Sequence, residues 1–167
     1  FDTPVDDEDK VDISVVFDAV TKATPHLKQG VVIAVSSQLP VGTSTTICSM
    51  IKKARPELSF SYFYSPENLR LGDAVKCFME PGRIVVGADS SRTLDVAKEI
   101  FSKLNAEIIG MSPASAEMAK HAMNSWLGVS ISFTNDLADV CEKVGADVED
   151  VVRALKSEPR VGQKAFL

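Results

Sequence analysis

The sequence predicts an α/β protein in which a doubly wound sheet is followed by a helical segment with one long helix. Over residues 13–111, helical and strand-like patterns alternate with short connections, which is typical of a sheet that carries helices on both faces. From residue 112 onward the strand-like patterns stop, and two helical patterns follow. We therefore expect two parts, residues 1–110 and residues 111–167.

A change of period predicts the first helix and the first strand. Residues 13–29 carry apolar side chains at helical spacing after Asp12, a good N-cap residue, and Pro25 should kink this helix. Gly30 should end it. Residues 31–35 are continuously apolar and mostly β-branched, as in strands covered on both faces, which predicts a parallel sheet.

The remaining elements of the sheet region follow from the same alternation. Turn residues separate the patterns, and no repeat or low-complexity segment interrupts them. The predicted elements are a helix over 43–55, strands over 60–64 and 83–87, a helix over 89–104 and a short strand over 107–109.

The helical segment begins with an unusually long helix. Ser112 as N-cap, Pro113 at the first position and Gly145 as a stop bracket about 31 residues, which is roughly 46 Å of helix. Asp147 then begins a shorter amphipathic helix that ends near Pro159. Because the long helix is apolar around much of its circumference, we expect a homodimer that forms through it.

Composition and charge exclude several classes of protein. The 167 residues are 45% hydrophobic and 25% charged, an ordinary globular profile, and the apolar runs are far shorter than the ~18 residues of a membrane span. We therefore expect a cytoplasmic protein with no membrane partner. Residues 1–12 hold six of the 23 acidic residues and one of the 18 basic ones, so 17 of each remain elsewhere. Residues 13–167 therefore carry no net charge and show no basic stripe, which argues against a nucleic-acid partner.

Two sets of polar residues are candidates for chemistry. Lys120 and Asn124 lie one turn apart on the long helix, where an ammonium and an amide could stabilise a developing oxyanion, although both could simply be solvated. The loops 36–42 and 65–72 each follow a predicted strand, and ligands of open α/β sheets bind beyond the carboxyl ends of the strands. Glu67 in the second loop is a candidate general acid or base, and a surface role is the alternative.

Six blocks along the chain share one order and spacing with a known family. The blocks are Asp2-Thr3-Pro4, Ser37 to Gly42, Ser65 to Gly72, Pro81 to Gly87, Glu117 to Asn124 and Arg160-Val161-Gly162. They resemble those of the nucleotide-sugar 6-dehydrogenases, the UDP-glucose/GDP-mannose dehydrogenase family, and among them the UDP-glucose 6-dehydrogenases. The resemblance covers essentially all 167 residues. It implies that residues 1–110 form the second half of a Rossmann-like NAD-binding domain and residues 111–167 a central dimerisation domain.

The resemblance also implies a reaction. UDP-glucose would be oxidised to UDP-glucuronate by two successive hydride transfers to NAD, through a cysteine thiohemiacetal and a thioester. Lys120 and Asn124 would hold the substrate oxygen and a water, and Glu67 would act with water in proton transfer and thioester hydrolysis. The remaining implied contacts are Thr3 and Ser37 with NAD, Asn68, Leu69, Arg70 and Leu71 with the sugar nucleotide, and Arg160 with the sugar across the dimer.

The chain departs from the family pattern in ways that limit these expectations. Gln38 stands where many members have Thr, and Leu71 where many have a second Glu. The nine glycines form no G-x-G-x-x-G fingerprint, and Cys48, Cys77 and Cys141 lack the setting of the family's nucleophile, so we expect a truncated chain that is inactive alone. Two alternatives remain open: a non-catalytic dimerisation module, and a hydroxyacid dehydrogenase of the 3-hydroxyisobutyrate or 6-phosphogluconate type.

Overall fold

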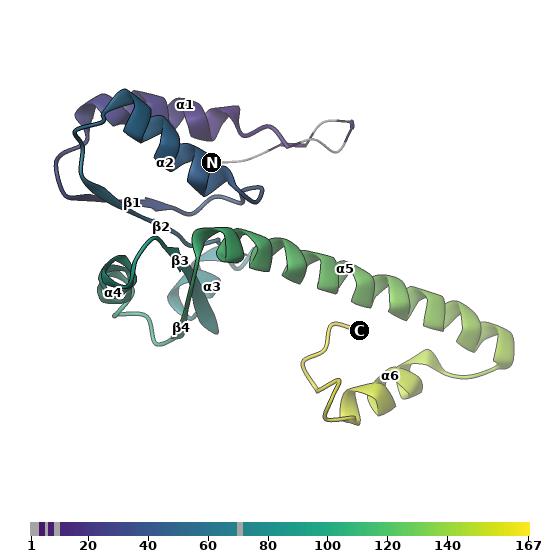
Figure 1. Ribbon diagram of the computed structural model, residues 1–167. Coiled ribbons are helices and arrows are strands. Elements are labelled where there is room, and N and C mark those ends of the chain that lie inside the picture. Colours follow the sequence, from purple (N-terminus) through teal and green to yellow (C-terminus); the bar gives the residue numbers. More distant parts are fainter. Residues whose placement is uncertain (1–3, 6, 9–10, 70–71) are drawn as a thin grey trace. The chain divides into compact units, whose positions relative to one another are not determined.

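The computed structural model describes residues 4–5, 7–8, 11–69 and 72–167 (Figure 1). Contacts between residues divide the chain into two compact units, residues 1–120 and residues 121–167. The long helix α5, Pro113–Val144, begins in the first unit and continues into the second.

The first unit is built on a four-stranded sheet in the order β1-β2-β3-β4. Its strands are β1 Val31–Val35, β2 Phe60–Tyr64, β3 Arg83–Ala88 and β4 Glu107–Met111. The pairs β1-β2 and β3-β4 are parallel, as expected. The central pair β2-β3 is antiparallel, so the sheet is mixed, whereas the apolar run in β1 had indicated a parallel sheet.

The connection between β2 and β3 explains this reversal. In the described part of this connection, residues 65–69 and 72–82, the only helix is the short α3, Ala74–Met79. Six residues of helix rise about 9 Å, less than the roughly 17 Å length of a five-residue strand, so this helix does not return the chain to the start of β2. The sequence patterns did not predict α3, and its apolar side chains Val75, Phe78 and Met79 are exposed rather than arranged as a buried stripe.

Helices cover both faces of the sheet, which confirms the doubly wound α/β class. On one face α1 Ser14–Ala23, α2 Thr43–Ala54 and the start of α5 form a core with Tyr62, Tyr64 and Val85. On the other face α4 Ser91–Ile100 packs on Phe63, Ile84 and Val86. β1 lies at the sheet edge and is only partly buried, yet Ile33 and Val35 pack against the core on one face and Val32 against the core on the other, as expected for a strand covered on both faces.

Local interactions move some predicted boundaries. The helix expected over 13–29 ends at Ala23 and continues as the short 3-10 helix η1, Thr24–His26, because Pro25 cannot extend the α-helical hydrogen bonds. The helix expected over 89–104 begins at Ser91, because the Ser90 hydroxyl accepts a hydrogen bond from the Thr93 amide at 3.2 Å and acts as N-cap.

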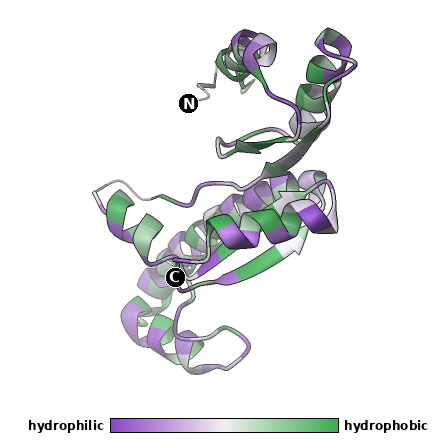
Figure 2. Cartoon of the chain, turned by 90° about the vertical axis from the view of Figure 1, so that its left-hand side faces the viewer, coloured by the Kyte–Doolittle hydropathy of each residue, from purple (hydrophilic) through white to green (hydrophobic). Residues whose placement is uncertain are grey.

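The second unit contains the rest of α5 and helix α6, Val148–Ser157. Gly145 adopts φ 74° directly after α5, and the Asp147 side chain accepts a hydrogen bond from the Glu149 amide at 2.8 Å. Both features confirm the predicted stop and the predicted cap. Figure 2 shows hydrophobic and hydrophilic residues on the same helices, and in the described part of the chain none has the length and apolar character to cross a membrane.

Gly87 provides a test of the packing between β3 and α5. A Cβ atom at this position would lie 2.7 Å from both the Ala116 Cβ and the Pro113 Cα. Because one of these atoms is backbone, G87A should lower the free energy of unfolding by about 1–3 kcal/mol. Urea denaturation of the chain measures this change.

Gly82 is the matched control for that substitution. A Cβ atom there meets nothing within 4 Å, and the residue does not have a positive φ. G82A should change the free energy of unfolding by less than about 0.5 kcal/mol. Equal effects of G82A and G87A would contradict the close contact between β3 and α5.

Candidate functional site

The candidate site lies at the carboxyl edge of β1 and β2. These strands are parallel and in register up to Val35 and Tyr64, so the loops that follow them begin side by side. The Ser65 amide donates a hydrogen bond to the Val35 carbonyl at 2.9 Å, which extends the pairing by one residue. The structure therefore brings together the starts of loops 36–42 and 65–69, as expected from the ligand-binding edge of α/β sheets.

The loop after β2 presents Glu67 and Asn68 beside the long helix. Glu67 is half-buried, and its Oε2 accepts a hydrogen bond from the Leu69 amide at 2.7 Å, which closes a local turn. The Lys120 Nζ donates a long hydrogen bond to the Asn68 Oδ1 at 3.4 Å. Two of the predicted regions, the Glu67 loop and the Lys120 helix, are therefore in contact.

Other predicted site residues are not part of this contact. Asn124 is exposed one helical turn beyond Lys120, in the second unit. Arg160 is also exposed in the second unit, where its Nε pairs with the Glu158 Oε1 at 2.8 Å. That hydrogen bond lowers the pKa of Glu158. Thr3, Arg70 and Leu71 lie outside the described residues.

Ser37, the other predicted cofactor contact, is buried in the loop after β1. This loop leads to Gly42, whose φ of 96° turns the chain into helix α2. The positive φ favours glycine, which explains the choice of residue at this turn. A buried serine directly beyond a strand is suitably placed to contact a ligand at this edge.

A buried carboxylate that the sequence analysis did not select dominates the polar interactions near this edge. Glu117, in the first turns of α5, has no exposed surface. Its Oε2 accepts a hydrogen bond from the Gly42 amide, and its Oε1 accepts from the Ser44 amide and the Ser44 hydroxyl, each at 2.7 Å. Both oxygens act as acceptors, as they do in an ionised carboxylate.

Glu117 occupies the N-terminus of α2. The first amides of a helix have no partner within the helix, and the helix dipole favours a negative charge beside them. Such a helix end can bind a phosphate. Because the Gly42 and Ser44 amides already donate to Glu117, this end of α2 is not open to the phosphates of a dinucleotide.

Two buried tyrosines lie beneath this carboxylate. The Tyr62 hydroxyl donates to the Ser44 Oγ at 3.0 Å, so a chain of hydrogen bonds runs from β2 through α2 to Glu117. The Tyr64 hydroxyl is also buried, and a hydrogen bond with the Leu39 backbone only partly offsets the effect of burial on its pKa. Burial raises the pKa of Tyr64 to about 12 and that of Tyr62 still further, so both phenols stay neutral at pH 7.

The three cysteines lie in helices and are partly or fully buried. Cys141 is buried in α5, and Cys48 and Cys77 are half-buried in α2 and α3. Burial, together with the charge of Asp89, raises the pKa of Cys48 to about 11. Among the described residues, no group of three or more His, Cys, Asp or Glu side chains is arranged to hold a metal ion.

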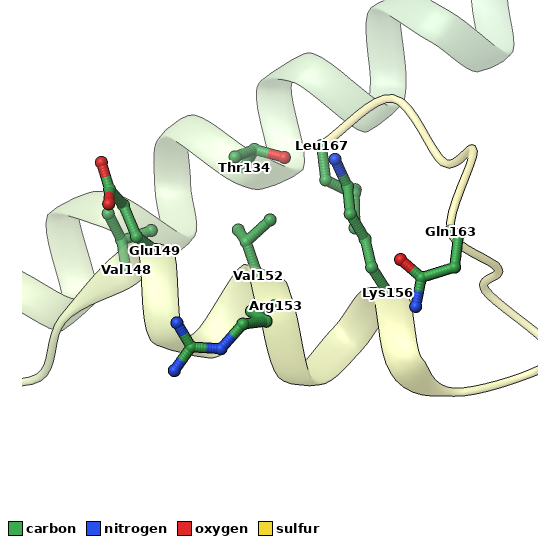
Figure 3. Close-up of a pocket in the computed structure, with 8 residues that line it drawn as sticks. All are labelled: Thr134, Val148, Glu149, Val152, Arg153, Lys156, Gln163 and Leu167. Atoms are coloured by element: carbon green, nitrogen blue, oxygen red, sulfur yellow. The ribbon is translucent and has the colours of Figure 1, made fainter.

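A separate pocket of about 410 Å³ lies in the second unit (Figure 3). In Figure 3, Val152 points from α6 toward Thr134 on α5, and charged side chains of α6 lie around it. None of the predicted site residues lines this pocket. The lining residues are Thr134, Val148, Glu149, Val152, Arg153, Lys156, Gln163 and Leu167.

Comparison with known families matches almost the whole chain. Residues 1–105 match the NAD binding domain of the UDP-glucose/GDP-mannose dehydrogenase family, and residues 114–167 match the central domain of the same family. The two matches meet near the start of the long helix. They include the strand-exit loops on one side and Lys120 on the other.

Individual relatives agree with the family match. The chain is 32% identical over 164 residues to the UDP-glucose 6-dehydrogenase of Rickettsia felis and 36% identical over 163 residues to UDP-glucose 6-dehydrogenase TuaD of Bacillus subtilis. These alignments cover 96% and 97% of this chain but only 36% and 35% of the relatives. The chain therefore spans little more than a third of their length.

A solved structure has the same fold. The UDP-glucose dehydrogenase of the hyperthermophilic archaeon Pyrobaculum islandicum superposes with a TM-score of 0.89 at 28% identity. The superposition covers 98% of this chain and 39% of that protein.

The environment of Cys48 predicts slow alkylation. At pH 8 the raised pKa leaves Cys48 with roughly 10²-fold less thiolate than a cysteine of ordinary pKa, and the thiolate is the reactive form. Peptide mapping after timed iodoacetamide treatment should therefore find Cys48 about 10²-fold slower in the folded chain than in urea. The rate should rise as the pH approaches 11. Equal rates in folded and unfolded chains would contradict the burial of this thiol.

Proposed function

Because the chain belongs to the UDP-glucose/GDP-mannose dehydrogenase family, we propose that it forms part of an NAD-dependent dehydrogenase that oxidises UDP-glucose to UDP-glucuronate. The observation that carries this proposal is the contact between Lys120 and Asn68, which brings the helix ammonium to the Glu67 loop at the ligand-binding edge. In this proposal residues 1–110 belong to the cofactor domain and residues 111–167 to the dimerisation domain.

The proposed roles of the chain's residues follow from their chemistry. Oxidation of a primary alcohol to a carboxylate removes four electrons, and NAD supplies the acceptor for the two hydrides. The Lys120 ammonium and the Asn124 amide hold the substrate oxygen as negative charge develops on it. Glu67 moves protons with a water at the alcohol and in the hydrolysis of a thioester to the family's catalytic cysteine, which is not Cys48, Cys77 or Cys141 and which leaves as the thiol.

Binding roles are proposed for the strand-exit loops. Ser37, buried beyond β1, supports a contact with NAD, and Thr3 is assigned there by family resemblance. Asn68, Leu69, Arg70 and Leu71 line the sugar nucleotide. The Gly42 and Ser44 amides at the start of α2 donate to Glu117, so in this proposal the phosphates of NAD are bound elsewhere. None of the chain's own cysteines is proposed as the covalent nucleophile.

Lys120 is the residue that tests this function. In the full-length protein K120A should lower kcat for NAD-dependent oxidation of UDP-glucose by about 10²–10³-fold, the range for loss of one oxyanion donor. NADH absorbance at 340 nm follows the reaction. K103A, which removes an exposed lysine after α4, is the control and should leave kcat unchanged.

Two outcomes would contradict the proposal. A folded K120A protein with less than about tenfold loss of kcat would mean that this lysine is merely solvated. A folded full-length protein that never reduces NAD with UDP-glucose would instead favour the non-catalytic dimerisation module.

We also propose that the protein is a homodimer formed through α5. Within the second unit this helix exposes several large apolar side chains, and soluble monomers rarely leave a large apolar patch uncovered. A two-fold partner presenting the same surface would cover them. Arg160 of each subunit would then contact the sugar nucleotide of the other. The exposed apolar residues are Trp126, Leu127, Val129, Ile131, Phe133, Val140 and Val144.

Trp126 tests the dimer, since its side chain is 70% exposed. Sedimentation equilibrium of the chain should give twice the 18.0 kDa monomer mass. W126E should shift the equilibrium toward monomer by about tenfold or more, and S125E, at the adjacent exposed position, should not. A monomer mass that is independent of concentration up to about 100 µM would refute the dimer.

A further inference from the structure

We propose that Glu117 is a positioning residue for the dehydrogenase reaction. Its buried carboxylate ties the helix that carries Lys120 to the loop after β1, and thereby holds the Lys120 ammonium against the Glu67 loop. This inference rests on the proposed function, because it assigns Glu117 to the same site.

The hydrogen bonds of Glu117 join distant parts of the chain. Its partners Gly42 and Ser44 lie 75 and 73 residues earlier in the sequence, and all three bonds measure 2.7 Å. A helix is normally capped by a side chain at its own N-cap position, as Ser90 does for α4. At the N-cap of α2 stands Gly42, which has no side chain, so the capping group comes from α5.

Because Glu117 is buried, its hydrogen bonds fix the position of α5 relative to α2 in addition to stabilising the start of α2. A buried carboxylate is costly unless every acceptor is satisfied, and a capping side chain within α2 would satisfy the same amides at less cost. The Glu117 carboxylate must instead meet two fixed amides and one hydroxyl. This requirement sets the position of the first turns of α5 relative to α2.

The same turns are held at a second point and carry Lys120. Ala116, adjacent to Glu117, is fully buried and lies so close to Gly87 on β3 that a Cβ there would clash. Lys120 follows Glu117 by three residues, so the two side chains leave neighbouring turns of one face. The hydrogen bond from Lys120 to Asn68 is long, 3.4 Å, and the position of the ammonium therefore follows from the helix that carries it.

The first experiment tests the hydrogen bonds between Glu117 and the start of α2 in the 167-residue chain. A glutamine side chain is the same size as that of Glu117 but has only one acceptor oxygen, and its NH2 group would face an N–H donor. E117Q should therefore raise hydrogen exchange at the Gly42 and Ser44 amides by about tenfold or more. The Thr43 amide between them donates to the Pro40 carbonyl and is the internal control, expected to change little. Unchanged hydrogen exchange at the Gly42 and Ser44 amides would show that Glu117 does not hold the start of α2.

The second experiment tests positioning in the full-length enzyme. E117Q should lower kcat by up to about 10²-fold while KM for UDP-glucose stays nearly constant, because a displacement of about 1 Å can have this effect on a reacting group. V86A is the control, because Val86 is fully buried in the core on the opposite face of the sheet. The kcat of E117Q is compared with the kcat of V86A at an equal loss of Tm, so that a general loss of stability is accounted for.

A double substitution decides whether Glu117 acts through Lys120. If it does, E117Q should cost much less kcat in a K120A background than in the native enzyme. Equal losses in both backgrounds, or a loss for V86A as large as that for E117Q, would overturn the positioning role. If the native enzyme itself fails to reduce NAD, the proposed function fails. The hydrogen-exchange experiment still tests whether Glu117 holds the start of α2.

Discussion

The interaction between the Glu117 carboxylate and the start of α2 is the constraint on which the candidate site depends. It satisfies helix amides that have no partner within the helix and places a negative charge where the helix dipole favours it. Because the carboxylate belongs to α5, the same bonds also join the strand-exit loop to the helix that bears Lys120. One buried side chain therefore serves helix stability and site geometry together.

Periodicity was sufficient to predict most of the fold, because helices and strands with one buried face leave a repeating pattern in the sequence. It failed where burial was absent. The short helix α3 exposes its apolar side chains, so it has no buried stripe to detect, and without it the connection after Tyr64 gave no sign that β3 runs antiparallel to β2. Strand direction depends on the path of the connection, which a pattern within the strand does not encode.

The candidate site was predictable only in part. Polar loops after strands, and a lysine one turn before an asparagine, have a chemical meaning that the sequence displays directly. Glu117 lies on the same helical face, yet a glutamate near the start of a helix usually faces solvent, and its partners Gly42 and Ser44 are more than 70 residues away. Only the packing of α5 on the sheet brings these groups together.

The occupied end of α2 also indicates which binding and catalytic roles this chain has in the proposed enzyme. A dinucleotide needs a helix end with open amides for its phosphates, and the chain has neither an open end at α2 nor a G-x-G-x-x-G turn. In the proposed function the chain supplies Glu67 for proton transfer and Lys120 for a developing oxyanion. In the proposed enzyme the hydrogen bonds of Glu117 to Gly42 and Ser44 occupy donors that a phosphate would need, so this helix end serves to position α5 rather than to bind the cofactor phosphates.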